Sequence, residues 1–206
     1  MSEKDPDSYI DVDRDPVATA YHGFLSITVH TLRHRRFDGT MSPTLKRELL
    51  ERGTSVCLLP YDPKTDKVLL IRQFLIGALV AGLAPRPLQV VAGMVDKDES
   101  DETAVRREAL EEAGCTLKRL ARAQAFLPSP GGTSERIVAF CGEADLEGLG
   151  GIHGLPSEGE DIRVEVVFAE AAIALLDSGA IEAGPAVVIL QWFARHRERL
   201  RAEWLR

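Results

Sequence analysis

One segment of the sequence, GMVDKDESDETAVRREALEEAGC at residues 93–115, constrains the fold more than any other. Its second half predicts a helix, because Ser100 is a favoured N-cap residue, two acidic residues follow it in the first turn, and Gly114 is a favoured C-terminal stop. Apolar residues recur at every fourth position of this helix and predict a face that packs into a core: Val105, Ala109 and Ala113.

Three glutamates of this helix, Glu108, Glu111 and Glu112, stand three and four positions apart and therefore share one face. Carboxylates so crowded repel one another unless a cation compensates them, and oxygen ligands suit a hard divalent cation such as Mg²⁺ or Mn²⁺. The alternative is a solvated surface helix whose acids pair with Arg106 and Arg107. The spacing of the whole segment favours the metal, because its fixed positions should coincide by chance in well under about one in 10⁴ chains of this length.

Written as G-x5-E-x7-R-E-A-x-E-E-x-G, the segment resembles the Nudix box, the signature of hydrolases that cut a nucleoside diphosphate linked to another group. The positions that carry the resemblance are Gly93, Glu99, Arg107, Glu108, Glu111, Glu112 and Gly114. Ala109 and Cys115 differ from the larger aliphatic residues that are usual in the family. Both are packing positions, so the chemistry that the resemblance implies is unaffected.

Composition narrows the class of protein. With 206 residues the chain is long enough for one large domain, or for a core domain with a smaller appendage. The net charge of −7 disfavours a nucleic-acid partner. Three widely spaced cysteines predict reduced thiols, the acidic N-terminus does not resemble a signal peptide, and no apolar run is long enough to span a membrane. We therefore expect a cytoplasmic protein whose partner is a small molecule, neither a membrane nor a nucleic acid.

The order of predicted elements indicates an α+β fold. Residues 1–16 are polar and expected to be disordered, and residues 17–52 predict a small antiparallel sheet that is too small to stand alone. That sheet must pack on the main domain or on a second subunit. Residues 53–206 mix strands and helices without strict alternation, which predicts a main domain with a mixed sheet flanked by helices.

The resemblance extends over nearly the whole chain to the bacterial ADP-ribose pyrophosphatases of the Nudix superfamily. The segments that carry it are GFLSITVHTLRHRRFDGTMS, RELLERG, SPGGTSER, GIHGL and EGEDIRVEVV. It implies a Nudix fold and Mg²⁺-dependent cleavage of ADP-ribose to AMP and ribose 5-phosphate. It also implies a homodimer whose subunits exchange the N-terminal sheet.

The resemblance further implies roles for individual residues. The metal ligands would be the backbone carbonyl of Ala92 and three carboxylates, and the complete set is Ala92, Glu108, Glu112 and Glu160. Glu111 lies near the metals, Arg107 orients the carboxylates, and Glu158 stands where the family places the base that activates the attacking water. The alternative for Glu158 and Glu160 is that they are solvated loop acids, and Glu160 is the second candidate for the base.

Substrate contacts implied in the same way come from three parts of the chain. Phe24 and Leu25, on an N-terminal strand, would lie near the adenine, where an aromatic ring can stack on a base. The partner subunit would supply Arg47, Glu48 and Arg52. The core would supply Met94, Ser129, Pro130, Gly131 and Glu135. Three ordinary explanations stand beside these roles: Phe24 as a core residue, Arg47 and Arg52 as a surface ladder with Glu48 and Glu51, and SPGG as a tight turn.

Two departures from the family pattern concern the substrate. Leu75 stands where the family usually has an arginine directed at the phosphates, and Gln89 stands where it often has a glutamate. Arg72 or Arg86 are candidates to compensate for the missing arginine. Losing one charge-assisted contact costs about 1.5–3 kcal/mol, enough to redirect substrate preference without abolishing hydrolysis. The alternatives are therefore the same chemistry on ADP-glucose, GDP-mannose or NADH, or a non-catalytic sensor of ADP-ribose.

Overall fold

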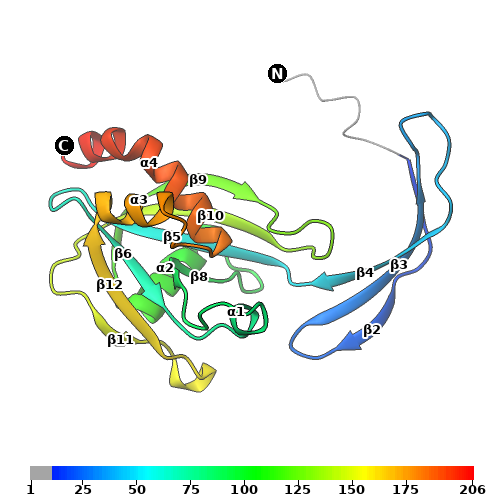
Figure 1. The fold of residues 1–206 in the computed structure, drawn as a ribbon, viewed down its shortest axis with the longest axis horizontal. Helices are drawn as coiled ribbons and strands as arrows, with labels where there is room; N and C mark the ends of the chain where they lie inside the picture. The colour runs from blue at the N-terminus through cyan, green and yellow to red at the C-terminus, as the bar shows by residue number, and fades with distance from the viewer. Residues whose placement is uncertain (1–10) are drawn as a thin grey trace. The chain divides into compact units, whose positions relative to one another are not determined.

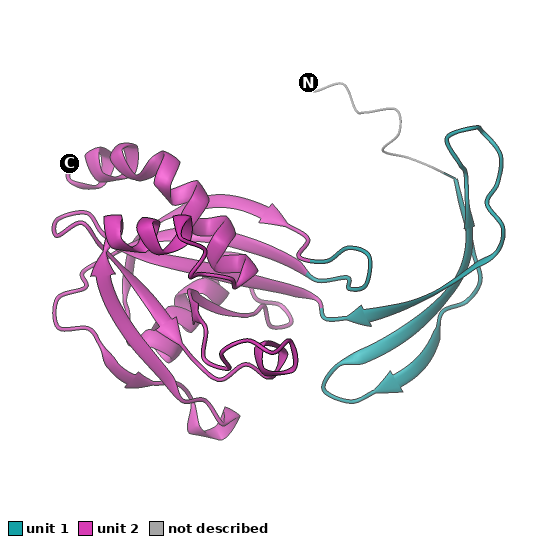
Figure 2. Ribbon diagram, viewed as in Figure 1, with its two compact units in different colours: residues 1–52, 129–135 teal, residues 53–128, 136–206 magenta. Residues whose placement is uncertain are grey.

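The computed structural model describes residues 11–206 and divides the chain into two compact units, which Figure 2 shows in different colours. The N-terminal unit comprises the chain up to residue 52 together with residues 129–135. The main unit comprises residues 53–128 and 136–206. Strands and helices occur together without strict alternation, and the α+β class is confirmed.

The N-terminal unit is a four-stranded antiparallel sheet in which β3 pairs with each of the other strands. Its strands are β1 (Val12–Arg14), β2 (Ala18–His22), β3 (Ser26–His34) and β4 (Leu45–Glu51). Among the described residues of this unit only Ser42 is buried, so the sheet has no hydrophobic core of its own. A sheet of this size is normally stable only when one face is covered.

Two expectations about this unit are corrected. Of the segment expected to be disordered, Val12–Arg14 forms β1, paired with β3, while residues 1–10 lie outside the described residues. Phe24 and Leu25 were expected on a strand, but they lie in the bend between β2 and β3. The bend follows from the hydrogen bond that the Gly23 N–H donates to the Leu25 carbonyl, which turns the chain directly before β3.

The main unit is built on an eight-stranded mixed sheet (Figure 1). Only β5 and β10 pair in parallel, and every other pairing within the sheet is antiparallel. Its strands are β5 (Thr54–Asp62), β6 (Lys67–Arg72), β7 (Leu88–Gln89), β8 (Val91–Met94), β9 (Leu117–Phe126), β10 (Arg136–Ala144), β11 (Gly151–His153) and β12 (Ile162–Phe168). The central strands β5 and β10 are buried along nearly their whole length, as expected of strands covered on both faces.

Helices cover both faces of this sheet. Helix α2 packs on one face, and α3 and α4 pack on the other (Figure 1). The helices are α1 (Ile76–Val80), α2 (Asp101–Ala113), α3 (Ala169–Asp177) and α4 (Gly184–Trp204), with a 3₁₀ turn η2 at Pro156–Glu158. Alternate residues of β5 serve the two cores, because Val56 and Leu58 belong to the cluster under α2 whereas Cys57 and Leu59 belong to the cluster under α4.

Helix α2 has the boundaries that the sequence predicts. The Ser100 side chain accepts a hydrogen bond from the Thr103 N–H at 3.1 Å, and Gly114 ends the helix in the left-handed region at φ 58°. The predicted apolar stripe is fully buried. None of the helices in residues 11–206 is long and apolar enough to cross a membrane.

Candidate active site

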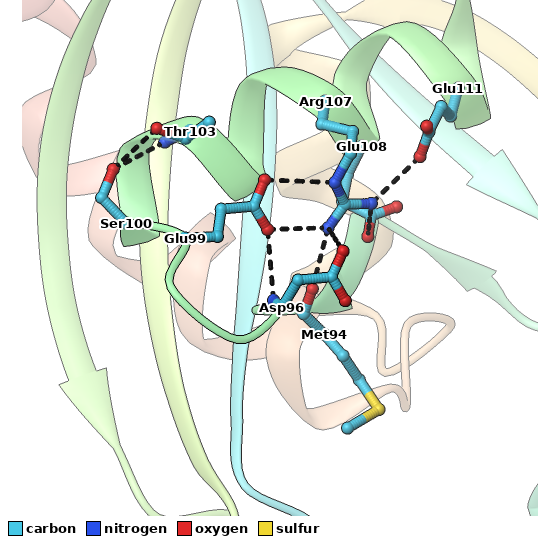
Figure 3. Close-up of polar contacts among 8 residues, drawn as sticks. All are labelled: Met94, Asp96, Glu99, Ser100, Thr103, Arg107, Glu108 and Glu111. Atoms are coloured by element: carbon cyan, nitrogen blue, oxygen red, sulfur yellow. Dashed lines mark hydrogen bonds and ion pairs between the residues drawn. The ribbon is translucent and has the colours of Figure 1, made fainter.

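Arg107 ties the loop before α2 to the helix (Figure 3). Its guanidinium donates to both carboxylate oxygens of Glu99, from Nε at 3.2 Å and from Nη2 at 3.0 Å, and Nη2 also donates to the Met94 carbonyl at 3.0 Å. The Glu99 carboxylate in turn accepts the Asp96 N–H at 3.2 Å. These contacts join β8 and the loop to the second turn of α2, and the hydrogen bonds from Arg107 hold the pKa of Glu99 below its usual value.

The same guanidinium also reaches the carboxylates of the helix. Its Nη1 donates to Glu108 Oε1 at 2.8 Å and to Glu111 Oε2 at 3.0 Å. With Glu99, these contacts raise the pKa of Arg107 well above its usual value. Arg106 instead donates to the carbonyls of Leu117 and Lys118. Glu108 and Glu111 are therefore both held by one arginine, unlike the evenly paired acids of a solvated surface helix.

Glu112 lies deepest in the site, with only 2% of its surface exposed. Its Oε2 accepts the backbone N–H of Ala92 on β8 at 2.9 Å. Burial raises the pKa of Glu112 to about 8, the Ala92 hydrogen bond opposes this shift, and the nearby charges of Glu108, Glu160 and Glu111 add to it. The charged form of Glu112 is therefore disfavoured, first by burial and then by the neighbouring carboxylates, and a bound cation would stabilise it.

Glu108 occupies the space that a side chain at residue 93 would need. A Cβ added to Gly93 would lie 1.8 Å from Glu108 Oε1, far inside van der Waals contact. Burial raises the pKa of Glu108, and Arg107 opposes the shift. The glycine of the motif therefore allows strand β8 to approach the Glu108 carboxylate closely.

Glu160 reaches the site from the loop between β11 and β12. Its Oε2 accepts the Leu155 N–H at 2.9 Å, and the Gly154 N–H donates to the Glu111 carbonyl at 3.2 Å, which attaches this loop to α2. A Cβ on Gly154 would lie 2.7 Å from the Cβ of Glu160. The charge of Glu160 contributes to the raised pKa values of Glu108 and Glu112, so these three carboxylates influence one another. Glu158, in η2, is exposed to solvent.

Gly154 is a residue of the site for which the sequence alone predicted no role. The signal was present as a glycine in GIHGL, a few residues before the loop acids, but loop glycines are common and most mark only a turn. Only the approach of Glu160 to the Gly154 backbone distinguishes this glycine from its neighbours.

The donors gathered here are of the kind that a hard divalent cation prefers, since all are oxygens and two of the carboxylates are buried. Within residues 11–206 no group of three or more His, Cys, Asp or Glu side chains already forms a metal cage. Glu112 and Glu160 accept backbone N–H groups, and Glu108 accepts Arg107. The chemistry of these residues and their mutual repulsion fit a divalent cation, and each carboxylate keeps lone pairs beyond those in the hydrogen bonds above that could bind it.

Residues predicted to contact substrate lie in both units. In the N-terminal unit Phe24 is 91% exposed, and Arg47 and Glu48 are exposed on β4. Arg52 pairs with Glu135, with Nε 3.0 Å from Oε1. The expectation that residues 129–135 belong to the core is corrected, because Leu50 exchanges backbone hydrogen bonds with Gly132 and Ser134 and this pairing attaches the loop to β4. Met94, partly exposed at the end of β8, belongs to the main unit.

The two departures from the family pattern lie near β6 and β7. Gln89 is 9% exposed and faces the same side of the sheet as Ile71, its cross-strand partner in the cluster under α2. Its Nε2 is the buried side-chain polar atom in residues 11–206 that lacks a hydrogen-bond partner. Leu75 is half-buried directly before α1, where its N–H donates to the Pro85 carbonyl.

Comparison with known proteins identifies the family. The model of the NUDIX domain matches residues 51–187, and the chain belongs to this family. It is 46% identical over 186 residues to an ADP-ribose pyrophosphatase of Escherichia coli strain K12, covering 90% of this chain and 89% of the relative. It is 39% identical over 209 residues to an ADP-ribose pyrophosphatase of Haemophilus influenzae, covering 100% of this chain and 96% of the relative.

Two further similarities are more distant. A GDP-mannose pyrophosphatase of Enterobacter sp. (strain 638) is 33% identical over 149 residues, covering 71% of this chain and 76% of the relative. A solved structure described as an ADP compounds hydrolase has the same fold, with a TM-score of 0.68 and 20% identity, covering 93% of this chain and 95% of that one. The chain is therefore a Nudix pyrophosphohydrolase, and the carboxylates of α2 lie within its matched domain.

The raised pKa of Glu112 predicts a stability effect in protein stripped of metal. Because its pKa of about 8 in the folded protein exceeds the usual value of 4.5, the stability linked to protonated Glu112 is present below about pH 4.5 and is lost as the pH rises to 8. Glu112→Gln should therefore be more stable than the wild type at pH 8 by at least about 1.4 kcal/mol, and the two should converge near pH 5. Urea unfolding in EDTA measures this difference. Equal stability at both pH values would contradict it, and Glu198→Gln, an exposed carboxylate on α4, is the control.

The contact between Gly93 and Glu108 predicts a loss of metal affinity. A methyl group at residue 93 must displace the Glu108 carboxylate, so Gly93→Ala should bind Mn²⁺ at least about tenfold more weakly. Electron paramagnetic resonance of free Mn²⁺ measures the affinity directly. Gly77→Ala is the matched control, because a Cβ there meets open space. Unchanged Mn²⁺ affinity in Gly93→Ala would refute the positioning of Glu108 by this glycine.

Proposed function

We propose that this protein hydrolyses the diphosphate bond of ADP-ribose to give AMP and ribose 5-phosphate, with Mg²⁺ as its cofactor and Mn²⁺ as a substitute. The observation that carries the proposal is the group of mutually repelling carboxylates on α2, held in place by Arg107 in a chain of the Nudix family. Buried like charges destabilise a fold, so their presence calls for a functional reason. Perturbed carboxyl pKa values also concentrate at functional sites.

The metal ligands in this proposal are Glu108, Glu112, Glu160 and the backbone carbonyl of Ala92. When bound, a divalent cation offsets the charge of the diphosphate and lowers the pKa of the attacking water. Arg107 keeps the carboxylates of Glu108 and Glu111 in position and leaves little of its guanidinium free for substrate.

The base in this proposal is Glu158, with Glu160 as the second candidate. Water attacks one phosphorus, its proton passes to the Glu158 carboxylate, and the bond from that phosphorus to the bridging oxygen breaks. An exposed carboxylate suits this role because it is free of the hydrogen bond that holds Glu160 to the Leu155 N–H. Glu160 is better placed to act as a ligand, since its charge already acts on Glu108 and Glu112.

ADP-ribose is favoured over other nucleoside diphosphates by the relatives. The relatives named as ADP-ribose pyrophosphatases match at 46% and 39% identity over 90% or more of this chain. The relative named as a GDP-mannose pyrophosphatase matches at 33% identity over 71%. The residues that we propose to contact the substrate are Phe24, Leu25, Arg47, Glu48, Arg52, Met94, Ser129, Pro130, Gly131 and Glu135.

The decisive experiment is to incubate the purified protein with ADP-ribose and Mg²⁺ and to separate the products by chromatography. The wild type should release AMP and ribose 5-phosphate, and Glu112→Gln should be slower by at least about a hundredfold. Glu198→Gln, which alters an exposed carboxylate far from the motif in sequence, should keep full activity.

A panel of ADP-glucose, GDP-mannose and NADH then tests the substrate. Faster turnover of any of these than of ADP-ribose would show that the enzyme prefers another substrate for the same reaction. Leu75 and Gln89 would then be the candidate determinants of that preference. Binding of ADP-ribose without turnover in Mg²⁺ would contradict the proposal and would favour a non-catalytic sensor.

We also propose that the protein is a homodimer whose subunits exchange the N-terminal unit, in a reducing cytoplasmic environment. The lack of buried hydrophobic residues among the described residues of that unit supports a partner that covers it. The three cysteines are free and buried, which supports a compartment without disulfide formation.

Subunit complementation tests the exchange. Glu112→Gln removes a proposed metal ligand of the main unit, and Arg52→Gln removes a proposed substrate contact of the N-terminal unit. Each homodimer should therefore have little activity. If each site combines the main unit of one chain with the N-terminal unit of the other, a mixed dimer contains one intact site and recovers activity. No recovery in mixed dimers of verified composition, or a monomeric mass by sedimentation equilibrium, would contradict exchange.

A further inference from the structure

A cleft lined by three arginines opens in the main unit, on the side of the sheet away from α2. Its volume is about 460 Å³, and its lining consists of Arg72, Arg86, Ile152, Asp161, Arg163 and Glu165. Ile71 and Val164, which neighbour Arg72 and Arg163 in the chain, belong to the cluster under α2. Because side chains alternate along a strand, Arg72 and Arg163 point to the opposite face.

The register of the strands brings the cationic groups together. Arg72 on β6 pairs directly with Arg163 on β12, and like charges in directly opposed positions destabilise a sheet unless something compensates them. Arg86, just before β7, lies beside them, since its carbonyl accepts Arg72 Nη1 at 3.3 Å. The cationic groups therefore come from β6, β12 and the segment before β7.

One carboxylate oxygen serves two of the arginines. Glu165 Oε1 accepts Arg72 Nε at 3.0 Å, Arg163 Nε at 3.0 Å and Arg163 Nη2 at 2.7 Å. Asp161 is the other acid in the cleft, and its Oδ2 lies 3.3 Å from Arg86 Nη2 in a pair that is exposed on both sides. Three guanidinium groups against two carboxylates leave one formal positive charge in the cleft of a protein whose net charge is −7.

The size and walls of the cleft suit a small organic anion. A volume of about 460 Å³ falls within the 300–1,000 Å³ or so of typical small-molecule sites. Ile152 pairs with Arg163 across β11 and β12 and is 66% exposed, so it adds an apolar wall beside the guanidinium groups. Arginine pairs with carboxylates and phosphates alike through parallel hydrogen bonds. A phosphomonoester carries a charge of about −1.5 to −2 and three acceptor oxygens, so it can accept from two guanidinium groups at once.

We propose that this cleft is a binding site for a phosphomonoester, whose phosphate lies between Arg86 and Arg163 and whose organic part contacts Ile152. The phosphate would compete with Asp161 for Arg86, because both are anions directed at the same guanidinium. The site is separate from the carboxylates of α2, and the proposal does not depend on the function proposed above.

Calorimetric titration of the full chain in EDTA tests the proposal with three probes: inorganic phosphate, AMP and ribose 5-phosphate. EDTA removes any contribution from metal at the α2 carboxylates. AMP or ribose 5-phosphate should bind saturably and more tightly than inorganic phosphate, and Arg86→Gln and Arg163→Gln should each weaken binding by about tenfold or more. Tighter binding of inorganic phosphate than of both esters would overturn the role of Ile152.

Two further variants separate a binding site from a structural ion-pair network. Asp161→Asn removes the competing anion and should tighten binding, whereas a cleft with only a structural role would show no such gain. Arg199→Gln is the matched control, since Arg199 is a similarly exposed arginine paired with Glu203 on α4, and it should bind as the wild type does. Absence of saturable binding, or equal weakening by Arg199→Gln, would overturn the proposal.

Discussion

The guanidinium of Arg107 is the interaction on which the rest of the site depends. It contacts the carboxylates of four residues, Asp96, Glu99, Glu108 and Glu111, and one backbone carbonyl, and so it joins β8, the loop before α2 and the helix itself. Without a cation in this position, Glu108 and Glu111 would face each other uncompensated in a partly buried place. Arg107 makes no hydrogen bond or ion pair with Glu112, whose pKa is raised mainly by burial and further by the charges of Glu108, Glu160 and Glu111. The site is thus built to hold its carboxylates in position while keeping an excess of negative charge.

Close backbone approach is the second requirement of the site. The Glu108 carboxylate fills the space over Gly93, and the chain at Glu160 lies against Gly154, so two elements from distant parts of the sequence meet at α2 through glycines.

The two units of the chain differ in how much hydrophobic surface they bury. The main unit has two hydrophobic clusters, one on each face of its sheet, whereas the described part of the N-terminal unit has no buried hydrophobic residue. Its stability therefore depends on what covers it.

Local signals in the sequence predicted the local structure well. Helix α2 begins and ends where Ser100 and Gly114 predict, because capping depends only on residues a few positions apart. Phe24 and Leu25 were misplaced because an apolar pair beside a strand does not reveal a bend. Residues 129–135 were assigned to the core because their pairing with Leu50 joins segments that are far apart in the chain.

By itself the sequence determined the class of chemistry, since the spacing of Glu108, Glu111 and Glu112 on a helix already places three carboxylates on one face. Only the tertiary structure decided how those carboxylates differ. The Glu112 carboxylate is buried and accepts the Ala92 N–H, whereas the Glu108 carboxylate accepts a hydrogen bond from Arg107. The backbone carbonyl of Glu111 accepts the Gly154 N–H and so attaches the loop that carries Glu160. The arginine cleft likewise could not be predicted from the sequence, because it depends on the register between β6 and β12. Burial and register arise from contacts between residues distant in the chain, and no local pattern encodes them.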